Sequence, residues 1–131
     1  MEYNYNLNPT NKTIVVTTGI NFTSYGAAEM DIFIRKTAKN LSYSIVFDYR
    51  ASNDFLSFGE AYFWFSNYFN EADFELRSIP TVLIANQTDI DKFNFFETVC
   101  YNNNIKLKVF LDIESSLPWI EEHTQIGNQN N

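Results

Sequence analysis

The sequence predicts a single α/β domain in which a β-hairpin is followed by βαβ crossovers, giving a mixed, mostly parallel sheet of five strands with about four helices. Short apolar runs rich in β-branched residues alternate with longer stretches in which apolar residues recur at helical spacing. The alternation closes with the strand-like run Val82–Ala85, a helical stretch and a second strand-like run over Ile105–Leu111. Strands joined through helices form right-handed crossovers, which make the strands parallel.

The size and composition are those of one globular domain. The chain has 131 residues, which we assign to a domain over residues 1–125 and a flexible tail over 126–131. An apolar fraction of 45% and an aromatic fraction of 18% supply a sizeable core. The net charge is −7 and the nine basic residues are scattered, which disfavours nucleic acid as a partner because phosphate binding needs clustered lysines and arginines.

The sequence also predicts the cellular location. No apolar run approaches the length of about 18 residues that a membrane span needs. The first residues, MEYNYNLNPTNK, lack the basic and apolar segments of a signal peptide. Cys100 is the only cysteine, so the chain forms no internal disulfide. We therefore expect a cytoplasmic protein with no membrane span.

The first elements are a hairpin, a helix and a third strand. Tyr3, Tyr5 and Leu7 alternate with asparagines, as in a half-buried strand, and the β-branched segment Thr13–Thr18 is the return strand. A helix follows from a cap at Thr23 or the next serine to about residue 40. Its apolar stripe consists of Ala27, Met30, Ile34 and Ala38. The third strand covers residues 43–47.

The middle of the chain is predicted to hold two further helices and a strand. Ser57 caps a helix over Phe58–Phe69, and a polar stretch over 70–78 leads to a fourth strand over 81–85. Thr88 or Asp89 caps the third helix, which ends near Tyr101 because three asparagines follow. The fifth strand covers residues 106–111.

The last predicted element is a short helix with Ser115 or Ser116 as its cap and Pro118 in its first turn. Loops that bind ligands lie at the carboxyl ends of parallel strands. In this chain those loops are Gly19–Ser24, Asp48–Ser57, Asn86–Asp89 and Asp112–Ser115.

In the order of these elements the chain resembles the STAS family of SpoIIAA-like (anti-sigma-factor antagonist-like) domains, and more narrowly the STAS/SEC14-like branch. The resemblance spans about residues 3–122. It rests on the opening hairpin, on Gly19 followed by a Thr-capped helix, on the strand ending Val46–Arg50, and on the closing segment VFLDIESSLPWI. It implies a non-enzymatic module that binds partner proteins, or small ligands, through the loop and helix after the third strand.

The chain departs from the family at that loop. Sigma-regulating members carry an Asp-Ser-[Ser/Gly]-Gly motif there, whose serine is phosphorylated, whereas this chain reads ASNDFLSFG over Ala51–Gly59. Ser57 lies near the equivalent helix start and is the one candidate phospho-acceptor. A serine at a helix start also serves as a cap, and we favour that interpretation.

The search for catalytic or metal-binding residues yields no site. His123 is the only histidine, and we expect it to be solvated near the end of the terminal helix. One histidine and one cysteine are too few ligands for zinc, and Cys100, one turn after Phe96, is expected to be buried. Five aspartates fall near the carboxyl edge, where a receiver domain holds Mg²⁺, but the strand before the first helix ends without a carboxylate. We expect caps and turns for Asp48, Asp54, Asp89, Asp91 and Asp112.

The second predicted helix carries more aromatic surface than one contact with the sheet covers. One stripe consists of Phe58, Tyr62, Phe65 and Phe69, and a second of Ala61, Trp64 and Tyr68, with Phe63 widening the arc. A neighbouring helix covers the excess, or a partner does. The candidate interface residues are Tyr62, Phe63, Trp64 and Tyr68.

Three functional classes follow from these observations. We favour association with a protein partner or with a second copy through the aromatic helix. The alternative is a carrier of a small apolar ligand, with a cavity lined by Phe58, Tyr62 and Phe93. An enzyme ranks third, because the sequence offers no convincing pair of titratable groups. We expect no cofactor and no metal.

Overall fold

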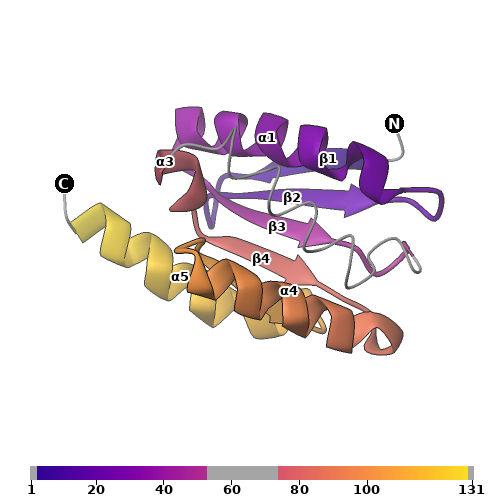
Figure 1. The fold of residues 1–131 in the computed structure, drawn as a ribbon. Coiled ribbons are helices and arrows are strands. Elements are labelled where there is room, and N and C mark those ends of the chain that lie inside the picture. Colours follow the sequence, from indigo (N-terminus) through magenta and orange to yellow (C-terminus); the bar gives the residue numbers. More distant parts are fainter. Residues whose placement is uncertain (1–2, 53–73, 130–131) are drawn as a thin grey trace.

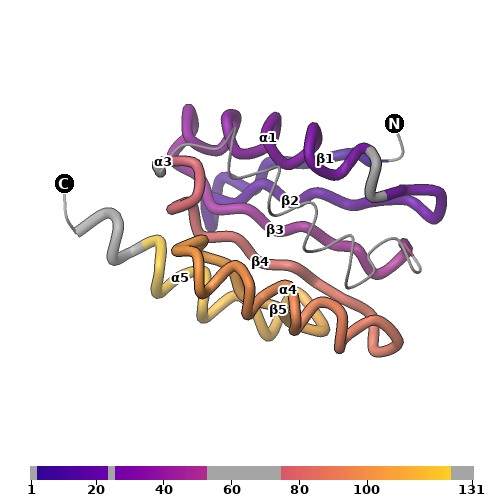
Figure 2. The backbone as a smooth tube through the Cα atoms, in the orientation of Figure 1, coloured from indigo at the N-terminus to yellow at the C-terminus, as the bar shows by residue number. Residues whose placement is uncertain are grey.

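The structure of the protein is a computed structural model that describes residues 3–52 and 74–129. Figure 1 draws its helices and strands, and Figure 2 follows the same backbone as a tube. The elements in chain order are β1 (Tyr3–Asn8), β2 (Thr13–Thr18), α1 (Ser24–Leu41), β3 (Ser44–Asp48), α3 (Phe74–Arg77), β4 (Thr81–Ile84), the 3₁₀ turn η1 (Gln87–Asp89), α4 (Ile90–Asn102), β5 (Leu107–Phe110) and α5 (Ile113–Gln129).

The five strands form a mixed sheet in the order in which they follow along the chain, β1-β2-β3-β4-β5. β1 runs antiparallel to β2, with Tyr3 opposite Thr18 and Asn8 opposite Thr13. The other neighbours are parallel. The predicted fold class is therefore confirmed, and β1 and β5 are the two edges of the sheet.

Helices cover both faces of this sheet. α1 and α4 lie on one face and α5 lies on the other (Figure 1). Right-handed crossovers between strands that follow one another across the sheet keep their helices on one side. α5 follows the last strand, so it is not part of a crossover, and it packs against β3, β4 and β5 from the opposite side.

The larger core lies under α1 and α4. The predicted stripe of α1 is confirmed, since Ala27, Met30, Ile34 and Ala38 are all buried. They pack with alternate residues of the strands, among them Ile45 and Phe47 of β3. At the β1 edge the predicted half-burial was wrong, because Tyr5 and Leu7 are 41% and 47% exposed and only Tyr3 is half-buried. The ring of Tyr5 meets that of Phe33 edge-on with centroids 5.9 Å apart.

A short helix, α3, lies inside the segment that the sequence predicts as a polar return. Arg35 of α1 holds it in place, because its Nη1 donates to the Leu76 carbonyl at 3.0 Å. The same guanidinium is fully buried and its Nε donates to Asp31 Oδ2 at 2.8 Å. A buried charge pair therefore connects α1 to the chain entering β4, a feature that the apolar periodicity of α1 does not indicate.

Predicted residues stand at the cap positions of α1 and α4, Thr23 and Asp89, but neither side chain makes a capping hydrogen bond. Before α4, the side chain of Asn86 accepts from the Asp89 N–H at 2.9 Å, and the chain makes the η1 turn before the α-helix begins. The predicted caps, Thr88 and Asp89, lie within that turn.

α5 is much longer than the short terminal helix that the sequence predicts. It begins at Ile113 and continues to Gln129, into the predicted tail. Asp112 caps it, because Oδ1 accepts from the Ser115 N–H at 2.7 Å, so neither Ser115 nor Ser116 is the cap. Pro118 consequently lies inside the helix and not in its first turn. Ile120 packs on Val46, Val82 and Ile84, which form the smaller core.

The capping bond of Asp112 makes stability depend on pH. The hydrogen bond from Ser115 lowers the pKa of the Asp112 carboxyl below its ordinary value of 3.8. A carboxyl with a lowered pKa stabilises the fold above its ordinary pKa and loses that effect as the pH falls through the folded-state value. We expect Asp112→Ala to lower the urea midpoint at neutral pH, and the difference from the wild type to shrink in acid. Asp91→Ala removes the same charge as a control, and an acid-independent difference for Asp112→Ala would contradict this account.

Candidate binding groove

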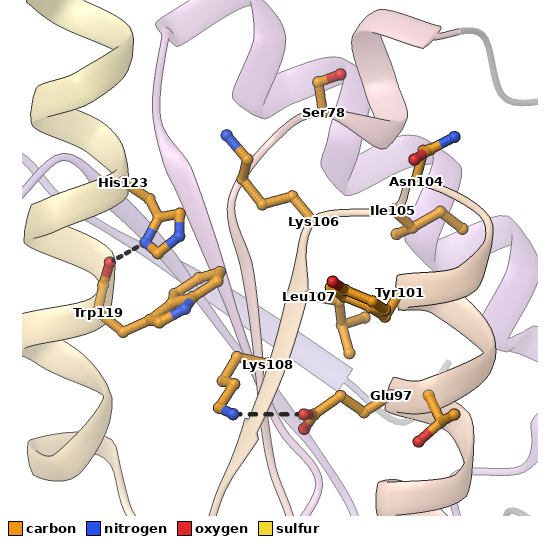
Figure 3. A pocket seen from close by; sticks show the side chains of 11 residues that line it. Ser78, Glu97, Tyr101, Asn104, Ile105, Lys106, Leu107, Lys108, Trp119 and His123 are labelled. Carbon is orange, nitrogen blue, oxygen red and sulfur yellow. Dashed lines mark hydrogen bonds and ion pairs between the residues drawn. The ribbon is translucent and has the colours of Figure 1, made fainter.

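A groove lined by several titratable side chains runs along the outer edge of β5. It encloses about 750 Å³ between α4 and α5 (Figure 3). α4 and the loop after it form one wall, and Trp119 and His123 of α5 form the other. The lining residues are Ser78, Glu97, Thr98, Tyr101, Asn104, Ile105, Lys106, Leu107, Lys108, Trp119 and His123.

The asparagines after α4 shape one end of the groove. Asn103 donates from Nδ2 to the Val99 carbonyl at 2.8 Å, and Asn104 adopts a left-handed conformation with φ 62°. The Ile105 N–H then donates to the Cys100 carbonyl at 2.9 Å, which turns the chain into β5. The prediction that asparagines end this helix is confirmed, since asparagine tolerates left-handed geometry.

A carboxylate from α4 lies against the strand edge. Glu97 Oε2 accepts from the Val109 N–H at 2.8 Å, and Oε1 lies 3.5 Å from Lys108 Nζ. Lys108 is about half exposed, and Lys106, two residues earlier, points to the same face of β5 and is exposed. Lys106 and Lys108 thus form a basic rim on the groove (Figure 3).

The other wall of the groove is an aromatic stack. The rings of Trp119 and His123 have centroids 4.0 Å apart, and His123 Nδ1 donates to the Trp119 carbonyl at 2.7 Å. The expectation that His123 is simply solvated was therefore wrong, because the longer α5 places this residue one turn after Trp119 and half-buried. Helical spacing of four residues between the two rings was the signal in the sequence.

Neighbouring residues on α4 differ sharply in their exposure. Tyr101 is 80% exposed on the groove wall, and the sequence analysis did not single it out. Cys100 is fully buried, as predicted, and burial raises the pKa of its thiol far above the ordinary range. A thiol that stays protonated is a poor nucleophile, so Cys100 packs as a small apolar side chain.

The loops at the carboxyl edge of the sheet are held together by hydroxyl groups. Ser52 donates from Oγ to the Gly19 carbonyl at 2.7 Å, and the hydroxyls of Ser52 and Thr18 lie 2.6 Å apart. Both hydroxyl-bearing residues are buried. Two of the four predicted ligand loops thus meet here, and these contacts fix their backbones to each other.

The aspartates near that edge have structural partners. Asp48 binds Arg50 through both carboxylate oxygens, at 3.0 Å to Nε and 2.8 Å to Nη2, and this hydrogen bonding raises the pKa of the guanidinium. Asp89 is buried near Lys92, and Asp112 caps α5. Within residues 3–52 and 74–129, no group of three or more acidic, histidine or cysteine side chains could hold a metal ion.

Several predicted site residues lie outside the described residues. These are the interface candidates Tyr62, Phe63, Trp64 and Tyr68, the candidate phospho-acceptor Ser57, the aspartate Asp54, and Phe58 of the proposed ligand cavity. The third residue of that cavity, Phe93, is described, and it is buried against Tyr49 with ring centroids 5.7 Å apart.

No helix in the described part of the chain is both long enough and apolar enough to cross a bilayer. Comparison of the chain with protein-family models, with curated proteins and with solved structures finds no match.

Proposed function

We propose that this protein is a non-enzymatic, STAS-like module that acts in the cytoplasm by associating with another polypeptide. The observation that carries the proposal is the groove along β5, where the edge strand of the sheet lies between two helices with no further strand beside it among the described residues. Extended segments of partner proteins bind such edges through their backbones, and side chains beside the edge select among them.

The side chains around this edge are of the kind that binds proteins. Tyr101 projects from one wall with most of its surface exposed, and Trp119 contributes to the other. Tyrosine and tryptophan combine a large apolar surface with a polar group, and they dominate the binding energy of many protein interfaces. The groove thus offers both a backbone edge and aromatic anchors.

The fold supports the STAS-like part of the proposal. The opening hairpin, the helix after Gly19 and the strands that follow occur in the order on which the resemblance rests. The aromatic helix predicted over 58–69 remains a second candidate surface, proposed from the sequence alone. It is the surface through which a homodimer would form.

A photo-cross-linker in the groove tests the proposal. In the test variant, benzoylphenylalanine replaces Tyr101, whose side chain is exposed. In the control variant, benzoylphenylalanine replaces Lys36, an exposed residue of α1. In cells that express the protein, we expect a discrete polypeptide adduct from position 101 and none from position 36. Equal adducts from both positions, or no adduct from position 101, would contradict association through the groove.

Native mass spectrometry of the purified protein identifies the kind of partner. A dimer that disappears in the Trp64→Ser/Tyr68→Ser variant, while the monomer stays folded, would assign self-association to the aromatic helix. A small-molecule adduct would instead favour the carrier of an apolar ligand that the sequence leaves as the alternative. If the purified protein is a monomer without an adduct and position 101 still cross-links in cells, the partner is a protein other than a second copy of this chain.

A further inference from the structure

Some backbone N–H and C=O groups of β5 point away from β4, so they form no hydrogen bond to a neighbouring strand in the described part of the chain. Thr81 of β4 and Ala85, the residue after it, donate to the carbonyls of Lys106 and Phe110, each at 3.0 Å, so the even-numbered residues along β5 bond toward β4. Successive residues of a parallel strand bond to opposite sides. Leu107 and Val109 therefore direct their N–H and C=O groups into the groove.

Glu97 occupies two positions that an added strand would use. One carboxylate oxygen accepts the outward N–H of Val109, as a backbone carbonyl of a neighbouring strand would. The other oxygen pairs with Lys108, as an acidic side chain opposite it on that strand would. A single residue of α4 thus provides both interactions of an acidic strand, across the edge of the sheet (Figure 3).

The charge along the groove favours an acidic occupant. Lys106 projects on the same face as Lys108, and it forms no ion pair with any residue that the structure describes. The lining residues include these two lysines against one carboxylate, that of Glu97, although the whole chain carries a net charge of −7. On the opposite face of β5, Leu107 is buried in the core and the exposed Tyr101 lines the same groove.

We propose that this groove binds an acidic segment of a partner protein in an extended conformation, added as a strand alongside β5. The inference rests on the proposed function and specifies the partner. Backbone groups of the segment bond to Leu107 and Val109, its carboxylates face Lys106 and Lys108, and the Glu97 side chain moves away. Alternate residues of the segment are apolar and lie toward Leu107, because side chains of a strand alternate between faces.

A second copy of this chain fits the groove less well. If two β5 strands paired antiparallel about Leu107, Lys106 of one copy would lie opposite Lys108 of the other, and pairing about Lys108 would oppose the two copies of that lysine. Like charges directly opposite each other destabilise a strand pair. The net charge of −7 on each copy adds a repulsion over longer range.

The test uses a short fluorescein-labelled peptide that alternates glutamate with valine, and fluorescence anisotropy reports its binding to the intact protein. We expect Lys106→Glu to weaken binding by about 3- to 10-fold. Lys36→Glu makes the same change in net charge on an exposed residue of α1, and we expect it to leave binding nearly unchanged. Glu97→Gln removes the charge that competes with the peptide, and we expect it to tighten binding.

Two further peptides separate strand addition from plain charge attraction. A peptide methylated on every backbone nitrogen keeps its charges but has no N–H group left to donate to β5 along either edge, so we expect it to bind weakly. A peptide with lysine in place of glutamate should not bind. Equal binding of the N-methylated peptide, or equal losses from Lys106→Glu and Lys36→Glu, would overturn the proposal.

Failure of this proposal is distinguishable from failure of the proposed function. If the acidic peptide does not bind but position 101 still gives a specific cross-link, the groove binds a partner of different chemistry. If neither result appears, Glu97 and the two lysines serve only to protect the edge of the sheet from aggregation, a common role of charged residues on edge strands.

Discussion

We expect the Asp31→Ala variant to unfold with a free energy about 3–5 kcal/mol below that of the wild type. The substitution removes the carboxylate that lies 2.8 Å from Arg35 Nε, while the guanidinium stays buried under α1. A buried charge that loses its partner keeps its desolvation penalty without the attraction that offset it. Urea denaturation followed by circular dichroism measures the loss.

The Asp31→Leu/Arg35→Met double variant is the control for this prediction. It removes both charges and fills the site with apolar side chains, so it should be more stable than Asp31→Ala, although it loses the hydrogen bond to the Leu76 carbonyl. If the double variant is as unstable as the single one, the pair matters through the volume of its side chains and not through its charge.

The Phe47→Ala variant should lose about 3–5 kcal/mol of unfolding free energy. Phe47 lies on the central strand β3, is 1% exposed, and stacks on Tyr49 with ring centroids 5.8 Å apart. Tyr49 in turn contacts Phe22 and Phe93, so the truncated side chain leaves a cavity within a cluster of rings. Close packing around such a cavity relaxes only in part, which adds to the loss of apolar burial.

Two other substitutions serve as controls for the loss of unfolding free energy in Phe47→Ala. Phe47→Leu keeps most of the buried volume and should lose about 1–2 kcal/mol. Tyr101→Ala removes an aromatic ring that is 80% exposed, and it should change the unfolding free energy by no more than about 0.5 kcal/mol. A loss in Phe47→Ala as small as that in Tyr101→Ala would show that the ring is not part of the stabilising core.

The sequence predicts the order and type of most elements because their signals are local. The apolar stripe of α1 and the β-branched run of β2 are each visible within one short, continuous segment of the sequence, and both are confirmed. The start of α5 was misjudged because Pro118 favours a first-turn position, whereas the Asp112 cap and the packing of Ile120 on β4 together extend the helix in both directions.

The groove could not be predicted in the same way. Its central contact joins Glu97 to the backbone of Val109, and nothing in the local pattern around either residue specifies that they meet. The pairing of Arg35 with the Leu76 carbonyl joins residues even farther apart in the chain. Lys106 and Lys108 lie two residues apart in the sequence, but only the position of β5 at the edge of the sheet places them beside an open groove.

The order of strands in the sheet has a consequence for how the protein is made. Each new strand joins the edge formed by the one before it, so a chain leaving the ribosome finds its docking site already present at every step. The exception is the surface formed by Val46, Val82 and Ile84, which is complete only after β4 and which α5 alone covers among the described helices. A translational pause after β5 would therefore leave a sheet with one bare apolar face, and that nascent state is the one in which a chaperone is most needed.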